Sequence, residues 1–194
     1  MFNYVKETIT KTGTFDAGHR VMYERFKCNN LHGHTYKYEL TISYTNKLPL
    51  GYAIDFKEIK RTFMAVIEHF FDHGMILNPA DTHIINMCEQ IGSKYWVMYD
   101  RNTNFRNPTV ENICQEVFYT CLKVSDKLGY DIRMSRLDIW ETPTSKATLL
   151  IEDPMHIKTF INEYERDFVS EENIKKLDSF SVTREEYDSR NLKK

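Results

Sequence analysis

Two histidines and a cysteine stand together at the start of a strongly alternating segment. Cys28, His32 and His34 form the pattern C-x3-H-x-H, and over 35–45 the even positions are apolar or aromatic while the odd positions are polar. This period of two predicts a half-buried strand. Because side chains two apart share a face of a strand, His32 and His34 should project from the same side. Two neighbouring imidazoles suit a metal ion, which then needs a further ligand from elsewhere.

The best candidate for that third ligand is His19, which ends the predicted first strand in the sequence FDAGHR. A strand ending there could place His19 beside His32 and His34 across a hairpin. Three imidazoles with an open fourth position form the arrangement of catalytic zinc sites. A single buried histidine is more often a hydrogen-bonded core residue, so the prediction depends on all three together. The spacing leaves two roles open for Cys28, as a fourth ligand or as a reactive thiol.

Two further groups carry side chains that suit proton transfer or ligand binding. Asp72 and His73 directly follow an amphipathic helix and resemble an acid–imidazole pair, in which the carboxylate fixes the tautomer of the ring. The alternative is a histidine that interacts with the C-terminal end of the helix dipole. Glu141, in IWETPT, ends a predicted strand. Its carboxylate could bind a guanidine-like heterocycle through two parallel hydrogen bonds, or it could be an ordinary exposed glutamate.

Alternating segments predict the strands that would position these groups. A first strand falls within 2–15, and 132–140 is expected to pair with 147–151 as a hairpin. The segment 79–106 contains a predicted short helix and the strand-like YWVMY at 95–99. Together with the strand at 35–45, these segments predict a sheet.

Two amphipathic helices are predicted between the strands. The first begins at Asp55, where Asp55 and Glu58 have the spacing of a capping box. The second is expected to start with Asn107 as its N-cap and Pro108 at its first position. The order β-β-α-α-β-β predicts an α+β fold, with helices packed on one face of an antiparallel sheet.

The character of the chain changes after about residue 152. The stretch DPMHIKTFINEYERDF is amphipathic and helical, and Thr183 with Glu186 forms a second capping-box pattern. We therefore predict a catalytic domain over 1–152 and a helical C-terminal extension over 153–194, whose role the sequence leaves open.

Composition excludes several classes of protein. The 194 residues are 41% hydrophobic, enough for one domain with a core, and the net charge of −2 without a basic block argues against a nucleic-acid partner. There is no signal-peptide pattern and no apolar run of membrane-spanning length, so a cytoplasmic protein without a membrane partner is expected. The four cysteines are expected to be thiols, with Cys114 and Cys121 in a helical core.

Six short motifs occur in order over about 5–150: FDAGH, C-x3-HGH-x-Y, GYAIDF, DHGMILN, NPTVEN and WET. In this order they resemble the 6-pyruvoyltetrahydropterin synthase / 6-carboxytetrahydropterin synthase family. The resemblance implies the tunnelling fold (T-fold), an antiparallel sheet with two helices on one face. It also implies a homohexamer, a dimer of trimers whose active sites lie at subunit interfaces.

The resemblance also implies roles for the residues near the start of the strand predicted over 35–45. His19, His32 and His34 would bind Zn²⁺. Cys28 would be the catalytic thiolate that removes a proton from the side chain of the substrate. Three cationic side chains near these residues are candidates to bind a triphosphate, unless they are ordinary surface charges: Arg20, Arg25 and Lys27.

The remaining motifs imply the rest of the site. Asp72 and His73 would complete an acid–base relay from a neighbouring subunit. Glu141 would bind the pterin ring, with Thr109 contributing to the same pocket and Glu111 orienting that loop.

Motif spacing distinguishes the branches of the family. C-x3-HGH resembles the carboxy-forming branch and C-x5-HGH the pyruvoyl-forming branch, while a third branch has glutamate at the position of Cys28. The resemblance therefore implies a zinc-dependent lyase that converts 7,8-dihydroneopterin triphosphate to 6-carboxytetrahydropterin, acetaldehyde and triphosphate, towards 7-deazaguanines such as queuosine. The alternatives are pyruvoyl-forming activity and a non-catalytic zinc-binding scaffold. The long 79–106 segment and the C-terminal extension depart from the compact family pattern.

Overall fold

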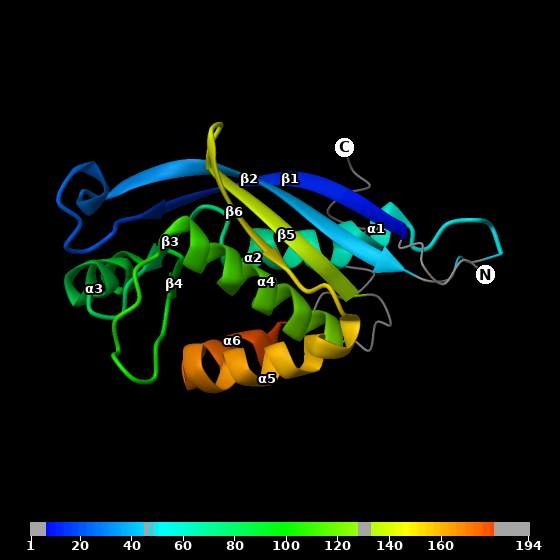
Figure 1. The fold of residues 1–194 in the computed structure, drawn as a ribbon. Coiled ribbons are helices and arrows are strands. Elements are labelled where there is room, and N and C mark those ends of the chain that lie inside the picture. Colours follow the sequence, from blue (N-terminus) through cyan, green and yellow to red (C-terminus); the bar gives the residue numbers. More distant parts are fainter. Residues whose placement is uncertain (1–6, 45–46, 48, 128–132, 181–194) are drawn as a thin grey trace.

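The computed structural model describes residues 7–44, 47, 49–127 and 133–180. The strands of this part form one six-stranded sheet in the order β4-β3-β1-β2-β5-β6 (Figure 1). Their bounds are β1 (Glu7–His19), β2 (His32–Tyr44), β3 (Gly74–Leu77), β4 (Tyr95–Val97), β5 (Arg133–Thr142) and β6 (Ser145–Leu150).

The sheet is mixed rather than wholly antiparallel. β1, β2, β5 and β6 pair antiparallel, as expected, and β5 with β6 forms the predicted hairpin. β3 pairs parallel with β1, and β4 pairs parallel with β3. The sequence predicted the strand at β4 but not the strand at β3.

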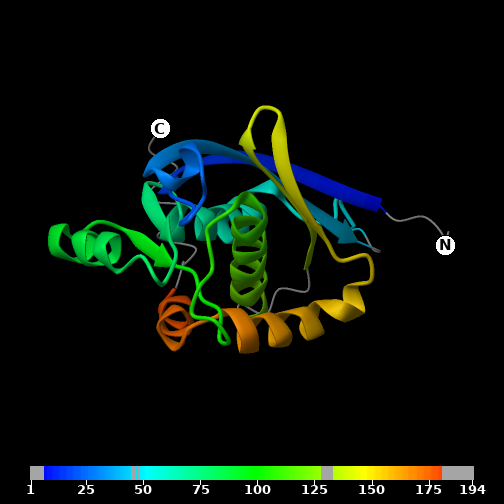
Figure 2. The ribbon, with the colours of Figure 1, turned by 60° about the vertical axis from the view of Figure 1, so that its left-hand side comes forward.

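Helices cover one face of this sheet, and two C-terminal helices lie on the far side of α4 from the sheet (Figures 1 and 2). The bounds of the helices are α1 (Phe56–Ile59), α2 (Ala65–Phe70), α3 (Thr82–Ile91), α4 (Val110–Lys127), α5 (Ile157–Phe168) and α6 (Glu171–Ser179). A π-helical turn over Lys60–Met64 joins α1 to α2, and short 3-10 turns occupy Lys27–Asn29 and Pro154–His156.

The first helix begins where the sequence predicts. The Asp55 carboxylate accepts a hydrogen bond from the Lys57 backbone N–H at 2.8 Å, which makes Asp55 the N-cap. The Glu58 carboxylate accepts from Arg61 at 2.7 Å.

The start predicted for α4 was wrong by two residues. The helix begins at Val110, and its first turn is held by Thr109, whose carbonyl accepts from the Ile113 N–H at 2.8 Å. Asn107 does not cap the helix with its side chain, because its side-chain amide binds the backbone of Met22 instead. That contact becomes important at the functional site.

The core lies between the sheet and the helices. Tyr36, Tyr38, Leu40 and Ile42, the even positions of β2, are each at most 2% exposed. Burying one such side chain contributes about 1.5–3 kcal/mol to folding. Cys114 and Cys121 of α4 are buried free thiols, as predicted.

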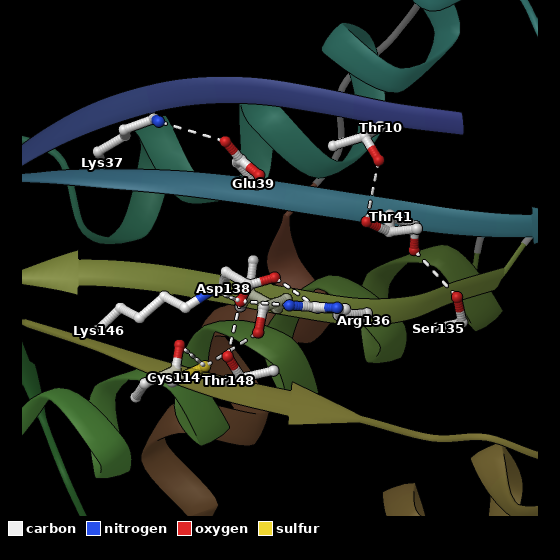
Figure 3. Close-up of polar contacts among 12 residues, drawn as sticks. Thr10, Lys37, Glu39, Thr41, Cys114, Ser135, Arg136, Asp138, Lys146 and Thr148 are labelled. Carbon is white, nitrogen blue, oxygen red and sulfur yellow. Dashed lines mark hydrogen bonds and ion pairs between the residues drawn. The ribbon is translucent and has the colours of Figure 1, made fainter. Parts of the chain in front are cut away.

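The opposite face of the sheet is polar. Figure 3 shows the Thr10 and Thr41 hydroxyls 3.1 Å apart across β1 and β2, and Asp138 receiving hydrogen bonds from Arg136 and Lys146. Burial alone would raise the pKa of Asp138, but these donors outweigh it and hold that pKa well below its usual range. The alternation along β1 and β2 therefore separates an apolar, helix-covered face from a polar one.

The described part of the C-terminal extension is mainly helical, as expected, and its last helix ends at Ser179. α5 follows an N-cap at Asp153 and a 3-10 turn, and α6 is capped by the Ser170 hydroxyl, which accepts from the Asn173 N–H at 3.1 Å. The predicted capping box at Thr183 and Glu186 lies outside the described residues. Each helix in the described ranges is too short or too polar to span a bilayer.

Candidate metal centre and catalytic groups

The histidine triad, His19, His32 and His34, gathers at one end of β1 and β2. His19 and His32 are direct partners in the antiparallel register, and His34 lies two residues further along β2 on the same face. Their ring centroids are 4.5, 4.9 and 5.2 Å apart. One potential ligand atom from each ring lies within 4.8 Å of the others. The triad predicted from spacing is therefore assembled by the long β1–β2 hairpin.

Backbone carbonyls orient two of these rings. His19 Nδ1 lies 2.7 Å from the Pro108 carbonyl oxygen, and His32 Nδ1 lies 2.7 Å from the Asn30 carbonyl oxygen. A carbonyl only accepts, so each Nδ1 carries the proton and each Nε2 keeps a free lone pair. This is the usual outer support of metal-binding histidines.

His19 Nε2 is the clearest sign that the residues fit a metal ion. This atom is buried and has no hydrogen-bond partner among the described residues, although a buried polar atom normally has one. Burial, reinforced by the neighbouring His32 and His34, lowers the pKa of His19 to about 4 despite its bond to Pro108. Burial also lowers the pKa of His34. His19 is therefore neutral near pH 7, which is the state that binds metal.

Glu141 stands beside the triad. It lies near the end of β5, its side chain is 23% exposed, and its Oε1 is 3.5 Å from His19 Nε2. The carboxylate can therefore reach a metal ion at the triad or a ligand bound next to it. The sequence predicted a binding role for Glu141 but not this proximity to His19.

Sequence reasoning missed a buried phenol next to the triad. The Tyr36 ring centroid lies 5.6 Å from that of His34 and 6.0 Å from that of His19. Its hydroxyl is buried and has no hydrogen-bond partner among the described residues. Burial, then the nearby Glu141 and Cys28, raises the pKa of Tyr36 well above its usual value. The alternation of β2 identified Tyr36 as a core residue and gave no signal of this polar environment.

Cys28 lies on an exposed 3-10 turn in the loop that joins β1 to β2. The Val21 N–H donates to the Cys28 carbonyl at 2.7 Å, which closes this loop. Asn107 clamps this loop with two hydrogen bonds. Its side chain accepts from the Met22 N–H and donates to the Met22 carbonyl, both at 2.9 Å. Two hydrogen bonds from one amide fix the loop against the segment before α4. The sequence had marked Asn107 only as a helix cap.

The three candidate cations near this loop differ in availability. Arg20 makes two hydrogen bonds to the carboxylate of Asp81, at 2.5 and 3.0 Å, and Asp81 is only 2% exposed. Arg20 is thus engaged within the chain. Arg25 and Lys27 are exposed on the loop itself.

The residues predicted from the NPTVEN motif take up different positions. Thr109 follows Pro108, whose carbonyl contacts His19, so Thr109 lies one residue from a triad contact. Glu111 is exposed on the first turn of α4 and lines a shallow cavity against β6.

Asp72 and His73, here called the dyad, form the predicted acid–imidazole pair. His73 Nδ1 lies 2.8 Å from Asp72 Oδ2, and the other carboxylate oxygen accepts from the Asp16 N–H at 2.8 Å. His73 has a φ of +55°, a left-handed backbone conformation that costs energy for a residue with a side chain. Its N–H bonds the Asp16 carbonyl at 2.7 Å, which helps to hold that conformation.

The structure does not bring the dyad to the triad within one chain. Asp16 and Thr35 contact each other at 2.5 Å across β1 and β2, and both alternate with residues whose side chains face the core. Side-chain ligand atoms of Asp72 and His73 lie within 4.8 Å of a carboxylate oxygen of Asp16, so the dyad lies on the polar side of the sheet, whereas the triad side chains lie on the helix-covered face. A shallow cavity of about 450 Å³ beside the dyad is lined by Asp16, Thr35 and His73, and also by His34 of the triad.

Comparison with known proteins shows the family of the chain. The family model described as 6-pyruvoyl tetrahydropterin synthase matches residues 8–152. A protein of Rickettsia felis named 6-carboxy-5,6,7,8-tetrahydropterin synthase is 34% identical over 139 residues, which are 69% of this chain and 93% of that protein. The protein of the same name from Haemophilus influenzae is 33% identical over 143 residues, 71% of this chain and 94% of its own length.

A solved structure supports the fold. The 6-pyruvoyl tetrahydropterin synthase of Plasmodium vivax superimposes with a TM-score of 0.51 at 18% identity, covering 75% of this chain and 97% of that one. The predicted α+β fold class is thereby confirmed, with the parallel strands β3 and β4 as a correction to the sheet. The match of the family model ends at residue 152, before α5 and α6. From its motifs, its fold and these matches, the chain belongs to the 6-pyruvoyl tetrahydropterin synthase family.

Proposed function

We propose that this chain is a 6-carboxy-5,6,7,8-tetrahydropterin synthase, a cytoplasmic lyase of the 7-deazaguanine (queuosine) pathway. The observation that carries the proposal is that relatives of this name match more than two thirds of the chain and nearly their own full length. The substrate is 7,8-dihydroneopterin triphosphate, and with water it yields 6-carboxytetrahydropterin, acetaldehyde and triphosphate. The C-x3-HGH spacing from Cys28 to His32 favours the same branch.

The proposed cofactor is Zn²⁺, bound by His19, His32 and His34. The free Nε2 of His19 and the carbonyls that orient His19 and His32 support this assignment. Three neutral imidazoles with an open position match catalytic zinc sites better than structural ones. A bound zinc ion would supply Lewis acidity toward side-chain oxygens of the pterin.

Side chains of the protein supply the remaining functions, which are proton removal and substrate binding. Cys28 removes a proton from the substrate side chain as its thiolate. Glu141 binds the guanidine-like edge of the pterin through two hydrogen bonds, and its place beside His19 supports a ring bound next to the metal. Thr109 contributes to this pocket, and Glu111 orients the loop before α4. Arg25 and Lys27 supply positive charge for the triphosphate.

The dyad completes the proton relay from a second subunit. Asp72 accepts from His73 Nδ1, which leaves His73 Nε2 to donate or accept a proton. Because the side chains of the dyad and the triad project from opposite faces of the sheet in one chain, we assign one of the two groups to a neighbouring copy. The assembly that the family resemblance implies, a homohexamer built as a dimer of trimers, would place catalytic sites at such subunit interfaces. α5 and α6 pack on the outer side of α4, away from the sheet (Figure 2).

The test is product analysis by mass spectrometry. Zinc-loaded protein incubated with 7,8-dihydroneopterin triphosphate should yield the 6-carboxy product and acetaldehyde, while Cys28→Ala and chelator-treated protein should not. A 6-pyruvoyl product would support the second candidate, which the description of the matching family model favours. Zinc-bound, folded protein without any turnover would point to a non-catalytic scaffold.

A further inference from the structure

A carboxylate in the interior of the molecule joins the C-terminal extension to the segment before α4. Glu116, on α4, is fully buried. Trp96 Nε1 of β4 donates to it at 2.9 Å, Arg106 at 3.3 Å and the Tyr164 hydroxyl of α5 at 2.7 Å. Three donors from three segments thus meet on one acceptor, and hydrogen bonds to a buried carboxylate are among the stronger ones in proteins.

Arg106 is enclosed mainly by the extension. Its side chain is 5% exposed, and its guanidinium lies 5.1 Å from the Tyr164 ring centroid and 4.5 Å from that of Phe168. Both rings belong to α5. Its Nη2 donates to the Gln115 side chain at 2.9 Å. Cation–π contacts of a desolvated guanidinium add to these hydrogen bonds, so α5 holds Arg106 both by its rings and through Glu116.

The extension also forms hydrogen bonds with the segment that precedes Arg106 in the chain. The Arg101 N–H donates to the Asp167 carbonyl at 2.9 Å, and the Asn173 side chain donates to the Val97 carbonyl at 2.8 Å. The stretch 97–106 is therefore held along its length by α5 and α6. Loops of this length are otherwise the parts of a fold with the least local stability.

The candidate site begins at the next residue. Asn107 clamps the Cys28 loop through Met22, and the Pro108 carbonyl orients His19. A shift of Arg106 changes the position of both contacts, because only one peptide unit separates Arg106 from Asn107.

We infer that the C-terminal extension is a brace for the metal centre, with Tyr164 and Arg106 as positioning residues that act through Asn107 and Pro108 on His19. The inference depends on the metal centre of the proposed function, and it assigns a role to the part of the chain beyond the family match. Outer contacts of metal-binding histidines commonly change metal affinity by 10–100-fold. Tyr164 lies further out, so a smaller effect is expected.

The test compares two tyrosines that bridge α4 and α5. Tyr164→Phe removes the hydrogen bond to Glu116, whereas Tyr119→Phe removes a hydrogen bond of the same kind to Glu165, 2.8 Å long, which does not involve Arg106. Co²⁺ affinity by chelator competition, the Co²⁺ absorption spectrum and the unfolding temperature are measured for both variants and the wild type. Tyr164→Phe should bind Co²⁺ about three- to tenfold more weakly with an altered spectrum. Tyr119→Phe should lose stability only.

Each other result is decisive. Unchanged affinity and spectrum in Tyr164→Phe, or equal losses in both variants, would overturn the brace, because the contacts would then serve stability alone. If Tyr164→Phe does not fold, Phe168→Leu removes an aromatic face from Arg106 and should give the same weakening. Wild-type protein that binds no Co²⁺ would overturn the metal centre itself, and that result is distinct from a failure of the brace.

Discussion

The histidine triad and the dyad lie at the same end of the sheet but on opposite faces. His19 of the triad is buried, with 1% exposed, whereas His32 and His34 are half-buried, and backbone carbonyls of the same chain orient the rings of His19 and His32. The dyad is open to solvent, with the His73 side chain 77% exposed on a left-handed backbone. One chain thus assembles its candidate metal ligands on the helix-covered face and presents the dyad to solvent. The proposed function assigns the dyad to the site of a neighbouring subunit, and this contrast makes that assignment testable.

Oligomers that contain two different variants give the most direct test of whether the triad and the dyad of one site come from different subunits. Cys28→Ala and His73→Ala should each lower kcat about 100- to 10,000-fold, since each removes an acid–base group. If the triad side of a site comes from one subunit and the dyad from another, co-expression of the two variants restores about a quarter of the sites by random assembly. Steady-state kinetics of the co-purified mixture provides the measurement. Activity that stays at the level of the single variants would place both halves in one chain.

Metal affinity gives the second contrast. His34→Ala should weaken Zn²⁺ binding on the order of 1,000-fold, because it removes one of three direct ligands. His73→Ala should leave the affinity unchanged, because its side chain lies on the other face. Competition with a chromophoric chelator at constant pH measures both values. A comparable loss in His73→Ala would mean that the dyad helps to bind the metal.

Acid sensitivity distinguishes the buried histidine from exposed ones. The folded pKa of His19 is about 4, below its usual value near 6.5. Its contribution to stability is therefore complete above pH 6.5 and is lost as the pH falls toward 4, by about 3 kcal/mol in total. His19→Asn retains an N–H that can donate to Pro108 but does not titrate. Denaturant unfolding of metal-free proteins at pH 7 and pH 4 should show the wild type losing about 3 kcal/mol more than this variant. Parallel losses would contradict a neutral, buried His19.

Sequence patterns predicted the parts of the fold that have a clear period. The alternation of β2 identified the face shared by His32 and His34, and the apolar stripe of α4 identified Cys114 and Cys121 as core residues. The parallel strand β3 was not predicted, because its pairing with β1 is a long-range contact of only three residue pairs. Such short pairings depend on tertiary context rather than on local propensity.

The site was predictable where side chains alone define it. The triad, Glu141 and the Asp72–His73 pair were all named from residue type and spacing. The carbonyls of Asn30 and Pro108 were not, because a backbone oxygen is present at every residue and carries no sequence signal. Asn107 was noticed but given the wrong role, since an asparagine before a proline has the signature of a helix cap as well as of a loop clamp.

The smallest expected effect tests whether the two faces of the sheet act independently. Thr35 lies between His34 and Tyr36 on β2, yet its hydroxyl donates to Asp16 at 2.5 Å on the polar face. Thr35→Val removes this exposed hydrogen bond and keeps a β-branched side chain suited to a strand, so it should cost less than about 1 kcal/mol of stability. Zn²⁺ affinity should remain that of the wild type, in contrast to the neighbouring His34→Ala. Unfolding curves and chelator competition on the same samples measure both quantities. A tenfold weaker Zn²⁺ affinity in Thr35→Val would show that the two faces are coupled through the strand, and the division of the site between two subunits would then lose its structural support.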